Sequence, residues 1–491
     1  MTVSSFCCNS ILAFLVTYNI LMVSASSCLI ALCKTSLSSV HPLSSYHTRA
    51  VPASWRQFSS FDPMSASRAG GSRPKVVVVT GPTAVGKSNL ALRICQDLAP
   101  GARGEIISVD SVQVYRGLDV GSNKPSEAER ARVPHHLLDV LDADSPEAFT
   151  AGDFVRKAEE AIDDVLARGG MPVVVGGTSM YTQWLVQGRP DAPKSDPEME
   201  QRARKMLAPF LDKKDWKGGL SLLKAHNTER AAKLHANDWY RLERALEVAL
   251  TTSQKGSDPE AAVPPSPSAH SSSSFTGIRS QTLSRKYDFR CFFLIAAREE
   301  LCRLIDRRCL QMVEGGLLEE TAHLLAAGTL NPSSPPGRAI GYRQTIEYLS
   351  KEGIEGEMAE ATALQEFLED FATATRRYAK QQMVWFRAQA EFMWLRWNLQ
   401  DLGPVLDAVR ASVAEDEVSH LARQEGKGQK ALRVENIMEG KRMRKYVSRV
   451  RAELTEDRLA DLVRRAQECR RQVHERQNCQ LREDDCCIRT K

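Results

Sequence analysis

The chain has 491 residues, of which 42% are hydrophobic and 26% charged, as is ordinary for a globular protein of about two to four domains. This composition excludes collagen-like, disulfide-scaffold and wholly disordered proteins. Lys and Arg number 66 and Asp and Glu 61, so the net charge of +5 says little about partners. The 12 Cys form no CxxC pair and no Cys/His zinc spacing, which indicates a reduced, intracellular core.

The N-terminal segment has the composition of a targeting leader. Residues 1–61 contain no Asp or Glu and are rich in Ser, as is typical of an organelle transit peptide. An apolar run at 11–16, continued at 20–23, also allows a signal-peptide region, so a bipartite leader stays open. The run is interrupted, which argues against a transmembrane helix. We predict a targeting or disordered leader over residues 1–73, a mitochondrial or plastid location with the cytoplasm as the alternative, and no membrane span in the mature protein.

From residue 74, strand patterns alternate with helix patterns. Short apolar runs at 75–79, 105–109, 173–175 and 292–296 predict buried strands, and helical spacing separates them. This alternation predicts an α/β fold with a parallel sheet of the phosphate-loop type. The catalytic core is expected in two parts, over residues 74–194 and 287–398.

Three segments are expected to lie outside this core. Residues 195–251 show helical patterns without a convincing strand and predict a helical insertion. Residues 252–286 are rich in Ser and Pro and predict a disordered insert. Residues 399–491 predict a charged helical extension, whose last part, from 440, holds 15 Lys and Arg against 9 Asp and Glu. We expect this tail either to help grip RNA or to be an exposed charged helix, without a structural zinc site.

The strongest local motif is a phosphate loop at residues 81–88, Gly-Pro-Thr-Ala-Val-Gly-Lys-Ser, between a predicted strand and a predicted helix. Its backbone amides and the helix N-terminus suit an oxyanion, Lys87 supplies a charge, and Ser88 a hydroxyl for Mg²⁺. A nucleotide triphosphatase also needs a later strand ending in an acid, but the strand at 173–175 ends in Gly-Gly-Thr. The pattern favours a diphosphate that leaves over a γ-phosphate that is transferred.

Asp110 ends the strand that follows the phosphate loop in sequence. Ligands of open α/β sheets bind beyond the carboxyl ends of the strands, so Asp110 is expected near the phosphate. A carboxylate there can accept a proton or bind an amine, although a helix N-cap or a Mg²⁺ ligand are alternatives. Residues 110–125 are rich in amides and hydroxyls, which suit a base edge. Thr178 can donate to a phosphate oxygen, although Gly-Gly-Thr also makes ordinary turns.

Together these motifs resemble the tRNA dimethylallyltransferase (tRNA isopentenyltransferase) family. The resemblance covers about residues 75–390, most of the chain after the leader. Its matching segments are, in order, residues 81–88, 107–115, 118–125, 134–139, 175–178, 237–248, 308–316, 339–344, 375–380 and 385–387. The segment from Asp110 to Pro125 is much more specific than the phosphate loop.

The resemblance implies transfer of a dimethylallyl group from dimethylallyl diphosphate to N6 of the adenosine immediately 3′ of the anticodon in tRNA, by a monomer. Asp110 then resembles the general base, and Thr178 and Arg308 resemble further catalytic contacts to the diphosphate. The implied diphosphate cradle comprises Gly81, Thr83, Ala84, Gly86, Lys87 and Ser88, with Mg²⁺ near Ser88. The implied tRNA contacts are Ser111, Gln113, Lys124, Arg241, Arg244, Gly341, Tyr342, Arg343 and Gln344.

Several alternatives stay open. Within the family, an adenylate isopentenyltransferase of cytokinin synthesis would prenylate a free nucleotide. From other classes, a phosphate-loop NTPase or small-molecule kinase and a non-catalytic RNA-binding module compete. Arg241 and Arg244 also fit a solvated helix face, and Arg308 fits an ion pair with a neighbouring acid. His135 and His136 are interpreted as structural, because adjacent residues of a strand point in opposite directions.

Overall fold

The computed structural model describes residues 72–97, 103–146, 149–188, 196–255, 286–424, 427–443 and 446–489. The predicted leader lies outside these ranges except for its last two residues, as does most of the predicted Ser/Pro-rich insert. The chain divides into two compact units at residue 60, and all described residues belong to the second. Within these ranges, no helix combines the length and the apolar character needed to cross a bilayer.

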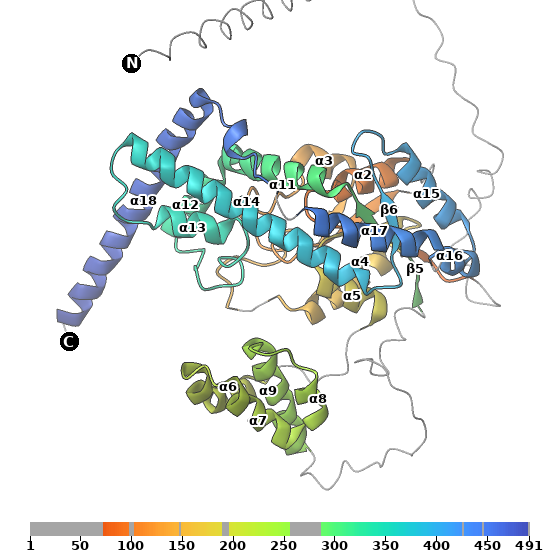
Figure 1. The fold of residues 1–491 in the computed structure, drawn as a ribbon, viewed down its shortest axis with the longest axis horizontal. Coiled ribbons are helices and arrows are strands. Elements are labelled where there is room, and N and C mark those ends of the chain that lie inside the picture. Colours follow the sequence, from red (N-terminus) through yellow and green to blue (C-terminus); the bar gives the residue numbers. More distant parts are fainter. Residues whose placement is uncertain are drawn as a thin grey trace, which may run out of the picture. The chain divides into compact units, whose positions relative to one another are not determined.

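A parallel six-stranded sheet forms the centre of the fold, in the order β3-β2-β4-β1-β5-β6 (Figure 1). The predicted α/β class is therefore confirmed, and all four predicted strands are present, somewhat extended. The strands are β1 (Lys75–Thr80), β2 (Gly104–Val109), β3 (His135–His136), β4 (Met171–Gly176), β5 (Asp288–Ile295) and β6 (Met393–Arg396).

Two edge strands were not predicted. β3 has only two residues, which pair with Ile106 and Ile107, and a segment so short shows no periodicity. β6 follows a long helix without a turn signal, and its pairing from Phe292↔Met393 onward with β5 makes it a strand. Tertiary pairing rather than local propensity decides both.

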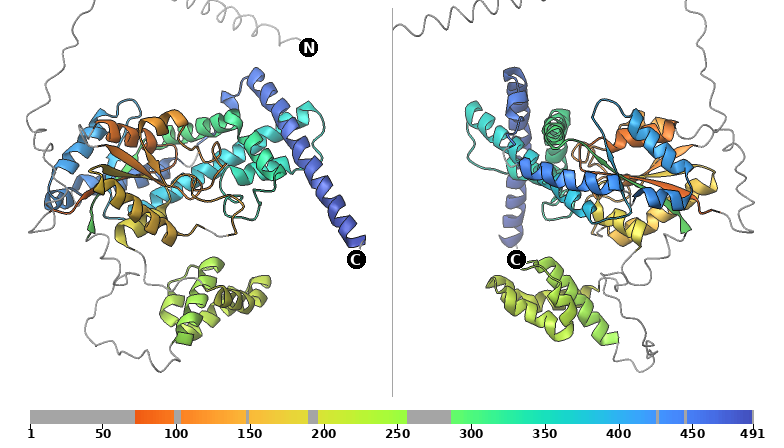
Figure 2. Two further views of the ribbon diagram at one scale, coloured as in Figure 1. Left: turned by 180° about the vertical axis from the view of Figure 1, so that it is seen from behind. Right: turned by 45° about the vertical axis from the view of Figure 1, so that its right-hand side comes forward.

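Helices cover both sides of the sheet. Figure 2 (right) shows α2 (Lys87–Asp97) and α15 (Gly403–Ala414) on one side, and α4 (Ala151–Ala167) and α5 (Ser179–Gln187) on the other. The β1 run Val76–Val79 is fully buried between these layers, as an apolar parallel strand requires. A further short helix, α3 (Glu127–Arg132), precedes β3.

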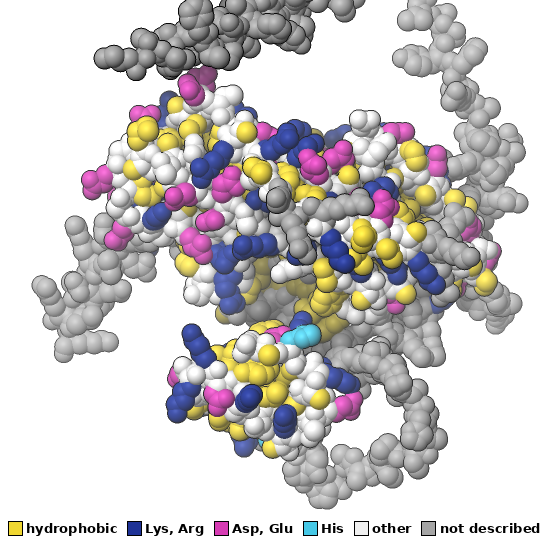
Figure 3. All heavy atoms as spheres, in the orientation of Figure 1, with side chains coloured by type: hydrophobic (Ala, Val, Ile, Leu, Met, Phe, Trp, Pro, Cys, Tyr) yellow, Lys and Arg dark blue, Asp and Glu magenta, His cyan; other side chains and the backbone are white. Residues whose placement is uncertain are grey.

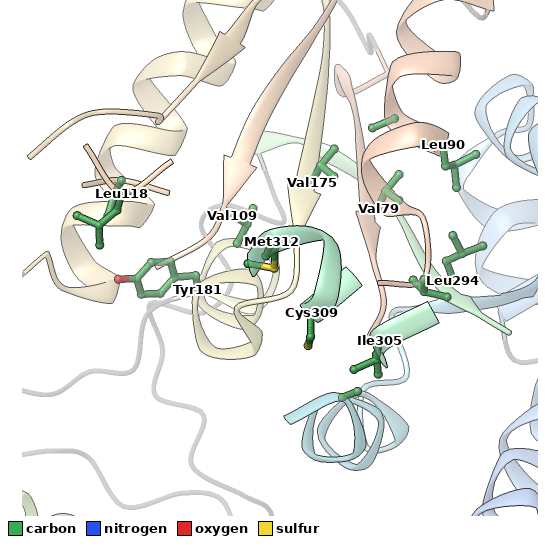
Figure 4. Packing of buried hydrophobic residues seen from close by; sticks show 14 of the residues in the cluster. Val79, Leu90, Val109, Leu118, Val175, Tyr181, Leu294, Ile305, Cys309 and Met312 are labelled. Carbon is green, nitrogen blue, oxygen red and sulfur yellow. The ribbon is translucent and has the colours of Figure 1, made fainter. Parts of the chain in front are cut away.

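The second part of the core is mostly helical. Helix α11 (Arg298–Met312) follows β5 and ends in a π-helical turn, η3 (Val313–Leu317). The chain continues through α12 (Leu318–Ala326), α13 (Tyr342–Leu349) and the long α14 (Glu357–Arg387). In Figure 4, Ile305, Cys309 and Met312 of α11 lie among the buried residues of the sheet core. Helix α11 is thus fixed against the strands.

The inserted helices form a bundle with a hydrophobic core of its own. They are α6 (Pro197–Asp212), α7 (Trp216–His226), α8 (Thr228–Ala232) and α9 (Trp239–Lys255). Met199, Leu207, Leu223 and Leu246 belong to a buried cluster separate from that of the sheet. Helix α9 extends to Lys255, beyond the predicted boundary at residue 251, because its helical pattern continues into the Ser-rich segment.

The C-terminal extension packs against the core. After α15 come α16 (Glu417–Gln424), α17 (Lys427–Arg442), a 3₁₀ turn η4 (Arg451–Glu453) and α18 (Glu456–Arg489). Helix α18 lies across α12 and α14 (Figure 2, left). Its Leu462, Val463, Ala466, Cys469 and Val473 are buried in the main core cluster. The interpretation of this tail as an exposed charged helix is therefore wrong for that face of α18.

Candidate active site

The phosphate loop connects β1 to α2, as the motif requires. Gly81 has a φ of 155°, and a Cβ there would lie 2.5 Å from the carbonyl oxygen of Leu294. Gly86 has a φ of 94°, and a Cβ there would lie 2.2 Å from the ring of Trp397. Both positions therefore need glycine. Ala84 also has a positive φ, 65°, so the loop backbone curls tightly between the two glycines.

Lys87 begins α2 and folds back onto the loop. Its ammonium donates to the carbonyl oxygen of Pro82 at 2.9 Å. Burial lowers the pKa of Lys87 to about 7, the charge of Arg308 acts in the same direction, and Asp110 opposes both. Ser88 follows in the first turn of α2 and is exposed, so its hydroxyl is accessible to a metal-bound phosphate.

Asp110 lies directly after β2. Its Oδ1 accepts hydrogen bonds from the amides of Val112 at 2.8 Å and Gln113 at 3.3 Å. Burial raises the pKa of Asp110, and these hydrogen bonds and the charges of Arg308 and Lys87 act in the opposite direction. The charges of Asp110, Lys87 and Arg308 thus act on one another's pKa, even though β4 separates β2 from β1 in the sheet.

Thr178 joins the ends of β2 and β4. Its hydroxyl oxygen accepts from the amide of Ser111 at 3.2 Å, and its own amide donates to the carbonyl oxygen of Val109 at 3.3 Å. Thr178 is also the N-cap residue of α5, but its side chain makes no capping hydrogen bond. The hydroxyl thus holds the segment after Asp110 in place and keeps its own proton available for donation.

Arg308 projects from α11 toward this group of residues. The alternative of an ion pair with the neighbouring Asp306 is wrong, because Asp306 pairs with Arg376 of α14. Within the described ranges, Arg308 has no hydrogen bond or ion pair. Burial lowers the pKa of Arg308, and the nearby Asp110 opposes this shift. A guanidinium in such surroundings is suited to an anionic ligand.

Gln382 of α14 was missed in the sequence and connects two loops of the site. Its side-chain oxygen accepts from the amide of Thr83 at 2.8 Å, and its side-chain nitrogen donates to the carbonyl oxygen of Gly177 at 2.8 Å. Gln382 is 1% exposed. It lies between the matched segments at 375–380 and 385–387, and an amide in a helix carries no motif that reveals such a bridge.

Several residues that were predicted to contact tRNA already bind partners within the protein. The Lys124 ammonium donates to the carbonyl oxygen of Tyr115 and to Asp119 and Asp139, each at 2.6 Å, and its side chain is 2% exposed. Gln113 donates to the carbonyl oxygens of Ser122 and Asn123 at 3.2 and 3.1 Å. The prediction that Lys124 binds tRNA does not fit this buried, fully paired geometry. Lys124 instead fixes the loop that follows Asp110.

The motif at 339–344 supports the same loop from the other side. Tyr342 is buried and donates to Glu320 at 2.6 Å, while Gln344 is buried and accepts from the amide of Gly341 at 3.0 Å. The Glu320 carboxylate also accepts from the amides of Asp119, Val120 and Gly121, at 2.8, 2.7 and 3.0 Å. Tyr342 and Gln344 are therefore structural in this geometry. Arg343 is exposed, as a contact to a large ligand requires.

The two arginines of α9 differ in their surroundings. Arg241 is exposed and pairs with Asp238 at 2.9 Å, whereas Arg244 pairs with the buried Glu247. The exposed pair fits the interpretation of a solvated helix face and leaves Arg241 accessible.

His135 and His136 have protein partners of their own. His136 Nε2 lies 2.7 Å from a carboxylate oxygen of Glu105, and His135 Nδ1 lies 2.7 Å from the carbonyl oxygen of Val133. These contacts fit the structural role expected of both.

The surroundings of the site bear on metal binding and on where a cavity lies. The described residues contain no group of three or more His, Cys, Asp or Glu able to hold a metal. A Mg²⁺ at Ser88 would therefore take most of its ligands from phosphate oxygens and water, as Mg²⁺ commonly does. A pocket of about 750 Å³ beside the Asp119–Pro125 loop includes Arg116, Asn123 and Gln311 in its lining, but neither Asp110 nor Lys87 lines it.

The site combines an anion cradle with a half-buried carboxylate at the carboxyl ends of the parallel strands. A loop of backbone amides, a lysine and an unpaired arginine suit a diphosphate, and a carboxylate beside them suits the nucleophile that displaces it. Such an arrangement defines an enzyme that transfers a group from a diphosphate.

Comparison with known proteins agrees with this class. The model of the family described as IPP transferase matches residues 113–389, and that of isopentenyl transferase matches residues 74–140. The "tRNA dimethylallyltransferase 9" of Arabidopsis thaliana is 42% identical over 66% of this chain and 71% of its own. The tRNA dimethylallyltransferase of Protochlamydia amoebophila is 36% identical over 69% and 88%. The chain belongs to the tRNA dimethylallyltransferase (IPP transferase) family.

A solved structure extends the comparison to the fold. It shows a eukaryotic dimethylallyltransferase acting on tRNA, with a TM-score of 0.52 and 25% sequence identity, over 70% of this chain and 80% of that one. The family relationship therefore extends to the parallel sheet and its helices.

Proposed function

We propose that this protein transfers a dimethylallyl group from dimethylallyl diphosphate to N6 of the adenosine immediately 3′ of the anticodon in tRNA. The observation that carries the proposal is the position of Asp110 directly after β2, in a segment that Thr178 holds at the end of β4, while the phosphate loop with Lys87 follows β1. The charges of Arg308 and Lys87 act to lower the pKa of Asp110. The family membership and the relatives named for tRNA favour a tRNA acceptor over a free adenine nucleotide.

In this proposal the phosphate loop, Lys87 and Arg308 bind the diphosphate and stabilise the charge that grows on it as the allylic C–O bond breaks. Thr178 donates its hydroxyl proton to a phosphate oxygen. The Ser88 hydroxyl would help to hold a Mg²⁺ ion, which would supply further positive charge beside the diphosphate. Gln382 keeps the two loops of the cradle at a fixed separation.

Asp110 receives the adenosine amine. Its carboxylate orients N6 toward the allylic carbon and accepts a proton as the new C–N bond forms. The target base must leave the stack of the anticodon loop to reach so enclosed a group. Because burial raises the pKa of Asp110, we expect activity to fall on acidification at a higher pH than an exposed aspartate would give. The monomeric state, the magnesium ion and the organelle leader stay predictions from the sequence.

The first experiment measures the mass of products formed with dimethylallyl diphosphate and Mg²⁺. An anticodon stem-loop with adenosine at the target position is compared with AMP, ADP and ATP, for the unsubstituted chain and for Asp110→Asn. We expect prenylation of the stem-loop alone and a loss of about 100-fold or more in Asp110→Asn, the scale of a lost general base. Prenylation of the free nucleotides instead would contradict the tRNA proposal.

A further inference from the structure

The C-terminal extension contacts the helix that carries Arg308. Asp306 of α11 is fully buried, and its Oδ2 accepts from the Tyr446 hydroxyl at 2.8 Å and from the Arg449 amide at 3.0 Å. Its other oxygen pairs with Arg376 of α14, whose guanidinium lies 5.5 Å from the centre of the Tyr446 ring. Residues 446–449 lie beyond residue 389, where the family match ends. A segment outside the common catalytic region thus completes a buried carboxylate site on α11.

Asp306 and Arg308 lie on different faces of α11. Residues two apart on an α-helix are separated by about 200° around its axis, so they project to nearly opposite sides. Asp306 accepts a hydrogen bond from Tyr446, and Arg308 projects from the other side of the helix, where the charge of Asp110 acts on its pKa. Helix α11 is therefore fixed to the extension on one side and carries Arg308 on the other. A shift of the helix on the Asp306 side moves Arg308 as well.

A second contact holds the end of the same helix. Arg465 of α18 donates to the carbonyl oxygens of Val313 at 3.4 Å and Glu314 at 3.1 Å, in the π-helical turn that follows α11. Arg458 binds the Glu314 carboxylate at 2.6 Å. The Arg465 guanidinium thus joins two carbonyl groups of this turn to α18 and helps to fix the position of the turn. The extension therefore grips α11 at Asp306 and at its C-terminal turn.

Building on the proposed function, we propose that the extension from Tyr446 to α18 is a brace that positions Arg308 for the diphosphate. Tyr446 and Arg465 are positioning residues, which act through α11 and do not touch the substrate. The buried apolar face of α18 keeps the brace on α12 and α14. If the extension served only to hold the fold together, substitutions in it would lower stability without changing the affinity for diphosphate.

The test compares full-length Tyr446→Phe with the unsubstituted chain. This change removes one hydroxyl and keeps the ring beside Arg376. We measure the Kd of inorganic diphosphate with Mg²⁺, and the KM values for dimethylallyl diphosphate and for the stem-loop. We expect the diphosphate Kd and the KM for dimethylallyl diphosphate to rise about tenfold, as small displacements of a positioned group do. The KM for the stem-loop stays unchanged.

Two further variants separate positioning from stability. Val473→Ala removes buried methyl groups from α18 without touching Asp306, and we expect it to lower the Tm while leaving the diphosphate Kd unchanged. Arg465→Gln tests the second contact, and we expect it to weaken diphosphate binding as Tyr446→Phe does. The proposal would be wrong if Tyr446→Phe and Arg465→Gln kept the original affinity for diphosphate. It would also be wrong if Val473→Ala weakened diphosphate binding as much as they do.

A double substitution tests whether the effect passes through Arg308. In an Arg308→Ala background, Tyr446→Phe should add no further loss of diphosphate affinity, whereas independent losses would overturn the proposal. The diphosphate measurement needs no prenyl acceptor. Absence of prenyl transfer by the unsubstituted chain would therefore contradict the proposed function alone.

Discussion

Lys87 holds a charge that its surroundings disfavour. The lowered pKa, about 7, means that the folded protein binds fewer protons than the unfolded chain between pH 7 and the ordinary lysine range near 10.5. Stability from this group therefore rises with pH over that window and is lowest below pH 7. We predict that Lys87→Met raises the Tm of the free protein most at pH 6, with the gain shrinking toward pH 10, while diphosphate binding is lost.

Thermal unfolding of both proteins from pH 6 to pH 10 checks this prediction. Arg343→Met is the control. It removes a positive charge from an exposed side chain, so its effect on the Tm should not vary with pH in this way. A Tm difference for Lys87→Met that is constant with pH would contradict a neutral Lys87 in the folded state.

At the level of single residues, motifs predicted the phosphate loop with Lys87 and the place of Asp110 at a strand end, and the structure shows both. The roles of these residues and of Arg308, which the family resemblance implied, stay predictions. Gln382 and Glu320 were missed, because each acts on backbone groups far away in sequence, and such contacts depend on the fold. Lys124 shows the opposite error, since a lysine in a matched segment was assigned to tRNA and the fold buries it between carboxylates.

At the scale of elements, Glu320 of α12 holds the loop that follows Asp110. Its carboxylate accepts from three consecutive amides, and Tyr342 adds a fourth hydrogen bond. We predict that Glu320→Ala lowers the free energy of unfolding by about 3 kcal/mol, because it leaves these partly buried amides without an acceptor. We expect prenyl transfer to fall as well, since the loop carries the residues next to Asp110.

Urea unfolding and the transfer assay measure the two effects. Tyr342→Phe is the matched control, because it removes one of the four hydrogen bonds and should cost about 1 kcal/mol. Equal losses in both variants would show that the amides are not the main partners of Glu320.

Four of the six strands followed from short apolar runs, because a strand buried on both faces is apolar throughout. The edge strands did not, since β3 is too short and β6 begins soon after the long, aromatic-rich α14. The C-terminal extension was predicted from its high content of charged residues, and this prediction missed the narrow apolar face of α18. The helix carries charged residues on its exposed side and apolar residues on the side that packs against α12 and α14.

At the scale of the whole molecule, Figure 3 shows one face, on which basic and acidic side chains are interspersed around α14. We expect binding to tRNA to depend on particular exposed cations. We predict that Arg241→Gln in α9 weakens binding of the stem-loop about threefold to tenfold and lowers the slope of log Kd against log salt by about 1. The Tm should not change, because exposed ion pairs add little stability.

Filter binding at several salt concentrations checks the prediction, and Arg204→Gln in α6 is the control. Arg204 is also exposed and ion-paired within the same helical bundle, but it lies outside the motif at residues 237–248. Equal effects of the two substitutions would show a general charge effect rather than a contact at Arg241.

The separate hydrophobic core of the inserted helices bears on how this protein can evolve. Residues that stabilise the bundle are not those that stabilise the sheet, so mutations accumulate in one without eroding the other. Selection can therefore remodel the surface of α6 to α9 while the sheet core that carries Asp110 is inherited unaltered. The same division offers protein engineers a place to exchange the bundle as one unit.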